Sequence, residues 1–255
     1  MMGDSVAAEL LKLRSLRSSW VVLAASVLAI AAGGVLAVLI TADFDGSSLE
    51  RRATFDSADM SVVIIPLLAL VTASVAAAVF TGEYGSGLIR TTLTGVPSRR
   101  KLFAAKTLVV GLVAFALGQV VSFALFGLTL AAVGDRPAPI APWTSAAAGV
   151  PSAVASGSII AVVCLLALGL GAVVRSTAGT LVTVAVLLYV VPGLAAFLPA
   201  AVSDWVFALW LLNLAPQMVG GDGSLLSPVG AVAVAVGYAV VPLGCGWFLF
   251  SRRDA

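Results

Sequence analysis

The chain's most evident candidate for chemistry is a polar, glycine-rich segment between two long apolar stretches. The run Gly82-Glu-Tyr-Gly-Ser-Gly87 has the glycine content of a loop that holds phosphate groups. An ATP-binding loop also needs a Lys that reaches the phosphates, in the pattern G-x-x-x-x-G-K-[ST]. This Lys is missing here, and we therefore predict that the chain does not hydrolyse ATP by itself.

The residue types present also disfavour other catalytic or metal sites. The sequence has no His, which excludes His-assisted catalysis and His metal ligands, and Cys164 and Cys245 lie within apolar runs. An intramembrane protease would need a base beside its nucleophile or a set of metal ligands. An ion-coupled carrier would place ionisable residues at mid-membrane, and the middle of each apolar stretch has none. We predict no catalytic residue, no metal site and no cofactor bound directly.

The same polar segment carries the signals of a short helix. Ser86 can cap it, the stretch 87–94 would form it, and Gly95 and Pro97 would end it. Arg90 would lie away from the apolar stripe. An amphipathic helix of this kind can dock into a groove of another protein. The stripe would consist of Leu88, Ile89, Thr92 and Leu93.

Glu83 is the one acidic residue of this basic segment. We expect it within reach of Arg90 or of free backbone amides at the start of the short helix. The charges also allow a simpler interpretation, in which the basic residues only fix the topology and contact anionic lipid.

These residues must be positioned by a bundle of membrane-crossing helices. Of the 255 residues, 61% are hydrophobic and only 10% are charged, whereas soluble domains have about 25% charged residues. A helix needs about 20 apolar residues to cross the hydrocarbon layer. We predict an all-α membrane protein of six transmembrane helices, spanning approximately residues 20–40, 60–80, 107–133, 149–174, 177–199 and 229–250.

The positions of Lys and Arg predict the orientation of this bundle. With the N-terminus inside, eleven of the fourteen basic residues lie on the inner side, and only Arg51, Arg52 and Arg136 lie outside. Cytoplasmic loops carry such an excess of Lys and Arg. We therefore expect both termini in the cytoplasm. The net charge of +2 gives no reason to expect a nucleic-acid partner.

Two further segments are expected to lie at the membrane interface. In 5–18, Val6, Leu10 and Leu13, with Leu16 or Arg17, form an apolar face opposite Lys12 and Arg14, which is typical of a helix lying on a leaflet. On the outer side, Ser203-Asp204 would cap a short helix over 205–214 that ends at Pro216. Each of the two segments could also be a plain membrane anchor.

Two patterns in the sequence are similar to those of a known family. The residues Phe80-x-x-Glu83, Gly87, Arg90, Pro97 and Lys106 resemble the loop after the second span in permeases of the type-2 ATP-binding-cassette (ABC) exporter family. The opening Glu9-Leu-x-Lys12-Leu-Arg14-Ser-x-Arg17-Ser-x-Trp20 resembles the N-terminal element of small bacterial, actinobacterial-like members. The likeness covers essentially the whole chain, which we interpret as a single permease domain, 1–255. Leu88 and Tyr84 depart from the residues common in the family.

This resemblance implies a function and a set of partners. The chain would be the permease of an exporter with two permease copies, expected to form a homodimer, and two cytoplasmic ATPases, which would bind ATP and Mg. The substrate would be amphipathic, lipid-like or drug-like, and the location the bacterial cell membrane. A non-transporting scaffold or sensor subunit is the alternative. The residues implied at the ATPase contact are Glu83, Tyr84, Gly87, Leu88, Ile89, Arg90 and Leu93, and those of the interfacial helix are Leu10, Lys12, Leu13, Arg14 and Arg17.

Overall fold

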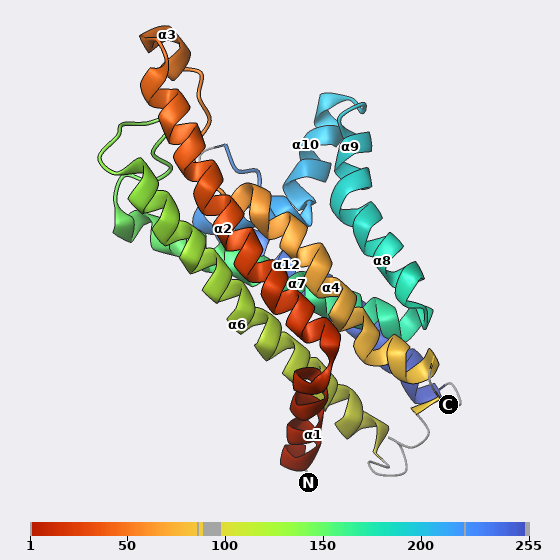
Figure 1. Cartoon of the computed structure of the whole chain (residues 1–255). Coiled ribbons are helices and arrows are strands. Elements are labelled where there is room, and N and C mark those ends of the chain that lie inside the picture. Colours follow the sequence, from red (N-terminus) through yellow and green to blue (C-terminus); the bar gives the residue numbers. More distant parts are fainter. Residues whose placement is uncertain (1, 86, 89–97, 222, 253–255) are drawn as a thin grey trace.

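The computed structural model describes residues 2–85, 87–88, 98–221 and 223–252, and every regular element within these ranges is a helix. Figure 1 shows long helices running between the two ends of an elongated bundle. The first helix, α1 (Met2–Ser15), and the last turn of α12 (Pro228–Arg252) lie at the same end. We call this the terminal end of the bundle.

Six helical segments of the described chain are long and apolar enough to cross a membrane. The prediction of an all-α protein with six spans is therefore confirmed. The third span begins at Arg99, well before the predicted start at residue 107, because Ser98 caps it with a hydrogen bond from the Lys101 amide at 3.4 Å. The spans are α2 (Arg17–Gly46), α4 (Ser61–Gly85), α6 (Arg99–Val133), α7 (Ala146–Val174), the composite α8–η1–α9 (Thr177–Ala195) and α12.

The centre of the bundle is α7, which is packed against α4, α6 and α12. Glycine makes the close crossings possible. A Cβ atom added to Gly118 of α6 would overlap the carbonyl oxygen of Gly157 on α7, and one added to Gly169 would lie 2.5 Å from the backbone of Pro242 on α12. Small residues let helix backbones approach closely in membranes, where van der Waals packing drives association.

Helix α1 packs against α6 and reaches α2 through a break at Leu16. The backbone of Leu16 is extended, with φ −73° and ψ 130°, and α2 begins at Arg17. The prediction that Arg17 belongs to the interfacial helix is therefore wrong. The prediction that the helix covers 5–18 is also wrong at its end, because α1 ends at Ser15. The Ser15 hydroxyl donates to the Lys12 carbonyl at 2.9 Å in this last turn.

The fifth span contains a defect that the rest of the fold stabilises. Its helix α8 (Thr177–Ala185) passes through the π-helical turn η1 (Val186–Val190) into α9 (Val191–Ala195), which has Pro192 in its first turn. Pro lacks the amide that would bond to the carbonyl four residues earlier. This carbonyl, that of Leu188, instead accepts a hydrogen bond of 2.9 Å from the indole nitrogen of Trp210.

The segment after the fifth span differs from the predicted single helix over 205–214. It consists of α10 (Ala200–Leu209), the 3-10 turn η2 (Leu211–Asn213) and α11 (Leu214–Val219). The predicted cap at Ser203 and Asp204 is wrong, because both lie inside α10, which Pro199 precedes. Pro216 does not end a helix but lies in the first turn of α11, where its missing amide costs nothing.

A short helix, α3 (Leu49–Arg52), and a small apolar cluster lie at the end of the bundle opposite α1. The cluster consists of Phe44, Ala58, Val133 and Ile140. There the guanidinium of Arg136 binds the carboxylate of Asp45 at 2.7 and 2.9 Å and so ties the end of α6 to the end of α2.

Candidate functional site

Four charged side chains meet where α1, α4 and α6 come together at the terminal end of the bundle. Lys106 on α6 has only 1% of its side chain exposed, Glu9 on α1 has 6%, and Glu83 on α4 has 12%. Lys12, also on α1, closes the group from outside with 44% exposed. We call these four residues the charge square.

Each carboxylate of the charge square contacts each ammonium group. Lys106 Nζ lies 2.9 Å from Glu9 Oε2 and 2.7 Å from Glu83 Oε1. Lys12 Nζ lies 2.9 Å from Glu9 Oε1 and 2.9 Å from Glu83 Oε1. Buried charges are stable only when they are paired and hydrogen-bonded. The charge square pairs two acids with two bases, and its formal charge is zero.

Lys106 and Lys12 have further stabilising interactions. Lys106 Nζ also donates to the Val79 carbonyl at 3.3 Å and lies 5.5 Å from the centre of the Phe80 ring. Partial burial lowers the pKa of Lys12, but the hydrogen bonds to Glu83 and Glu9 outweigh it, and the pKa is raised above 10.5. The Lys12 side chain is therefore a cation at neutral pH, and the charge square holds α1 against α4 and α6.

The sequence-based prediction for Glu83 is only partly correct. The structure places Glu83 in the last turns of α4, but its carboxylate contacts Lys12 and Lys106. Arg90, the predicted partner, lies outside the described residues. The pairing of Glu9 with Lys106 was missed, although both residues belong to the two family patterns. The available signal was Glu9 itself, an acid three residues before Lys12 in the segment predicted to be the interfacial helix.

The end of α4 is joined to the turn between α7 and α8 by a second set of contacts. The guanidinium of Arg175 lies 4.2 Å from the centre of the Tyr84 ring, within the range of a cation–π interaction. Arg175 caps α7 with a left-handed backbone, φ 55°, and its amide donates to the Gly171 carbonyl at 2.9 Å. One turn earlier on α4, the hydroxyl groups of Thr81 and Thr177 share a hydrogen bond.

The segment after α4 is described only at two positions. Gly87 has a left-handed backbone, φ +71°, which a residue within a right-handed helix does not adopt, so the predicted helix cannot begin there. The side chain of Leu88 is 56% exposed. The predicted contact residues Ile89, Arg90 and Leu93 lie outside the described residues, as do the predicted cap Ser86 and end signals Gly95 and Pro97.

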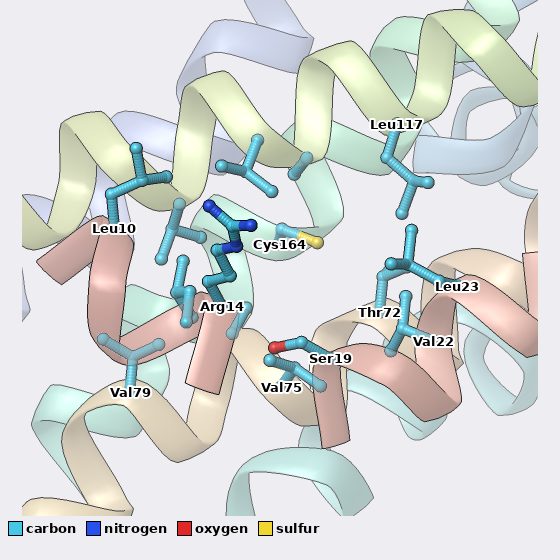
Figure 2. A pocket seen from close by; sticks show the side chains of 15 residues that line it. Leu10, Arg14, Ser19, Val22, Leu23, Thr72, Val75, Val79, Leu117 and Cys164 are labelled. Carbon is cyan, nitrogen blue, oxygen red and sulfur yellow. The ribbon is translucent and has the colours of Figure 1, made fainter. Parts of the chain in front are cut away.

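Three of the predicted interfacial residues surround a cavity beside the charge square. Leu10, Leu13 and Arg14 of α1 line it together with side chains of α2, α4 and α6 (Figure 2). The prediction placed Arg14 opposite the apolar face of the helix, but the structure places its side chain at the same cavity as Leu10 and Leu13. The face of α1 that is buried against the bundle carries Ser5 and Glu9 instead.

Comparison with protein families adds to this geometry. The model of the ABC-2 family transporter proteins matches residues 5–193, from α1 through the charge square to α9. The chain belongs to the ABC-2 transporter family. It is a multi-pass membrane protein and the permease of an ABC transporter, and permeases of this family work with a separate ATPase subunit. A comparison with curated proteins finds no match.

Proposed function

We propose that this ABC-2 permease is the membrane subunit of an exporter in which two permease copies work with two cytoplasmic ATPases. The observation that carries the proposal is the charge square, which ties α1 to the ends of α4 and α6 next to the segment that joins them. A force applied by a partner to α1 or to this segment would therefore reach three helices together.

The terminal end of the bundle is proposed to face the cytoplasm. Among the described residues, Lys12, Arg14, Arg99, Arg100 and Arg175 belong to α1, to the start of α6 and to the end of α7, all on this side of the spans. Such an excess of basic residues is typical of cytoplasmic segments. In a bacterium the membrane would be the cell membrane, with both termini inside.

The proposed cycle uses the contacts at the end of α4. Closure of the ATPases on ATP would press on the segment after α4 and on α1, and the bundle would tilt from an inward-open to an outward-open state. The Arg175–Tyr84 contact and the charge square would pass this motion to α7 and α6. ATP and Mg would be bound by the partner, and we assign no catalytic role to this chain.

We propose an amphipathic, lipid-like or drug-like substrate, carried along a path between the two copies that is lined by the second and fifth spans. Two polar side chains of the spans already have partners in the chain. The Tyr189 hydroxyl donates to the Pro66 carbonyl at 2.7 Å, and the Ser122 hydroxyl donates to the Ala153 carbonyl at 2.7 Å. Such surroundings suit apolar groups better than a small ion.

We propose one transmembrane domain, residues 1–255, although the family match ends at 193. The support is the packing of α12 against α7 and of α11 against both. The part of the chain beyond the match thus shares the core of the matched part.

The partner and its contact can be tested by replacing one exposed leucine at each end of the bundle. The chain is purified with a tag in mild detergent from membranes that contain its natural partners, and mass spectrometry identifies the proteins that accompany it. Leu88→Asp changes the segment after α4, and Leu49→Asp is the matched control, since Leu49 is 83% exposed at the opposite end.

We expect an ABC ATPase to accompany the wild type and Leu49→Asp, and the preparations to hydrolyse ATP. Leu88→Asp should lose this partner, because a carboxylate replaces an apolar side chain in the proposed contact. Retention of the ATPase by Leu88→Asp would exclude the assigned contact. Absence of any ATPase from the wild type, with several detergents and nucleotides, would favour a scaffold or sensor subunit instead.

A further inference from the structure

A cavity of about 350 Å³ lies between α1, α2, α4 and α6, and α7 contributes Cys164 to its wall. Figure 2 shows aliphatic side chains around most of its circumference, among them Leu23, Val75 and Leu117. Its volume falls within the range of small-molecule sites in proteins, about 300–1,000 Å³. The cavity starts at α1 and extends along the membrane-crossing helices α2, α4 and α6.

One cation belongs to this apolar cavity. Figure 2 shows the guanidinium of Arg14 directed into it, between Leu10 and Cys164. In the described part of the chain Arg14 has no ion pair and no hydrogen bond from its side chain. The nearby carboxylates of Glu9 and Glu83 already bind Lys12 and Lys106. The cavity therefore offers an anion one unpaired guanidinium, next to a wall that suits a hydrocarbon chain.

We propose that this cavity binds one acyl chain of an anionic phospholipid, with the lipid phosphate on the guanidinium of Arg14. Arg donates two parallel hydrogen bonds to a phosphate group. A zwitterionic lipid also has a phosphate, but the cation of its own headgroup competes with Arg14 for it. Placement of the lipid in the inner leaflet rests on the orientation given in the proposed function. The binding itself depends only on the cavity and on Arg14.

A phospholipid suits this place better than a soluble ligand does. Apart from α1, the wall is formed by membrane-crossing helices, and its polar groups are few: Arg14, Ser19, Thr72 and the thiol of Cys164. The Thr72 hydroxyl already donates to backbone carbonyls of its own helix, at 3.0 Å each. The anchoring charge is thus confined to the end formed by α1, as the headgroup of a lipid would require.

The test measures lipid binding by the full-length permease without its ATPase. The protein is stripped of lipid in a neutral detergent and titrated with phosphatidylglycerol or with phosphatidylcholine of the same acyl chains. Native mass spectrometry then gives the number of lipids bound and the apparent Kd. We expect one phosphatidylglycerol to bind more tightly than phosphatidylcholine.

Two variants address the two halves of the site. Arg14→Gln should weaken phosphatidylglycerol binding about fivefold and abolish the preference over phosphatidylcholine, because a basic residue near a membrane surface contributes about 1 kcal/mol toward anionic lipid. The matched control is Arg17→Gln, which removes the same charge three residues later, outside the cavity lining. Val113→Trp should weaken binding of both lipids, since Val113 lines the cavity and its 41% exposure leaves room for a larger side chain.

Three results would overturn the proposal: equal binding of the two lipids by the wild type, equal effects of Arg14→Gln and Arg17→Gln, or unchanged binding by Val113→Trp. The outcome is separable from that of the proposed function, because co-purification of the ATPase is scored on the same variants. If Arg14→Gln loses the preference for phosphatidylglycerol but still retains the ATPase, the result supports the lipid site and leaves the proposed function unchanged. Lipid binding without any ATPase would leave the cavity assigned and would contradict only the proposed transporter assembly.

Discussion

Replacing Lys106 by Met tests whether the charge square holds the terminal end of the bundle together. Met has a similar length and removes only the cation, so the packing around Phe80 should change little. Without Lys106, the carboxylates of Glu9 and Glu83, with 6% and 12% exposed, share the single cation of Lys12. The variant therefore leaves two acids and one base in a place that water barely reaches.

The expected loss follows from this imbalance. Removing one partner of a buried ion pair costs about 3–5 kcal/mol. Lys12 still contacts both carboxylates at 2.9 Å, which favours the lower end, about 3 kcal/mol. For a protein of about 250 residues each kcal/mol corresponds to about 2–4 °C in the melting temperature. We therefore expect Lys106→Met to melt about 6–12 °C below the wild type.

The assay is thermal unfolding of the detergent-purified chain, followed by the monodisperse fraction that remains after heating. The control is Lys101→Met, which removes the same charge from the first turn of α6 at an exposed position. Exposed substitutions usually change stability by no more than about 0.5 kcal/mol. If the two variants melt at the same temperature, the charge square does not stabilise the fold and the reasoning fails.

A second variant separates the ion pair from the volume of the side chain. In Glu9→Gln/Lys106→Met, one acid and one base are removed together, and the remaining pair, Lys12 with Glu83, is balanced. We expect the double variant to lose less stability than the two single variants added together, by about 0.5–3 kcal/mol. Strict additivity would show that Glu9 and Lys106 do not interact.

Three further predictions use the same melting assay. Gly118→Ala should lower the free energy of unfolding by about 1–3 kcal/mol, because the new methyl group would overlap a carbonyl oxygen of α7. The control Gly127→Ala, on the same helix, meets no atom within 4 Å and should be near neutral. Equal losses of stability in the two variants would contradict the close crossing. Trp210→Phe should lose about 1 kcal/mol with its hydrogen bond to the π-helical turn, and Trp205→Phe, whose residue is 54% exposed, should not. Because the pKa of Lys12 is raised in the folded state, the stability that Lys12 contributes is complete below pH 10.5 and is lost as the pH rises through the higher folded-state pKa. The difference in melting temperature between wild type and Lys12→Met should therefore stay constant from pH 7 to about 10. Disappearance of this difference below pH 9 would contradict the pairing.

The sequence predicted the spans because hydropathy is a property of consecutive residues. A run of about 20 apolar residues must cross the membrane as a helix, since no water is available there for an exposed backbone. Hydropathy of consecutive residues was not sufficient to predict where the helices end. The break at Leu16, the start of α6 at Arg99 after its cap Ser98, and the division of the outer segment at Trp210 depend on caps and backbone angles that several nearby residues could equally have supplied.

The ion pairs of the candidate site could not be predicted from the sequence. Glu83 was recognised as the exceptional acid of its segment, but a local reading assigned it a partner seven residues away. Its partners among the described residues are 71 residues before it and 23 residues after it. Nothing in the spacing of Glu9 and Lys106, which are 97 residues apart, predicts their contact at 2.9 Å. Only the packing of α1 against α6 brings them together.

The sequence by itself determined the helical class, the six spans and the two family patterns, because each depends on residue types along a continuous stretch of chain. The tertiary structure alone decided which glycines permit a helix crossing, as Gly118 does and Gly127 does not. It also decided that Arg14 reaches the cavity while Lys12 and Lys106 neutralise Glu9 and Glu83. These outcomes depend on the faces and depths at which helices meet, and a helix that crosses a membrane can be rotated about its axis without any change in its hydropathy.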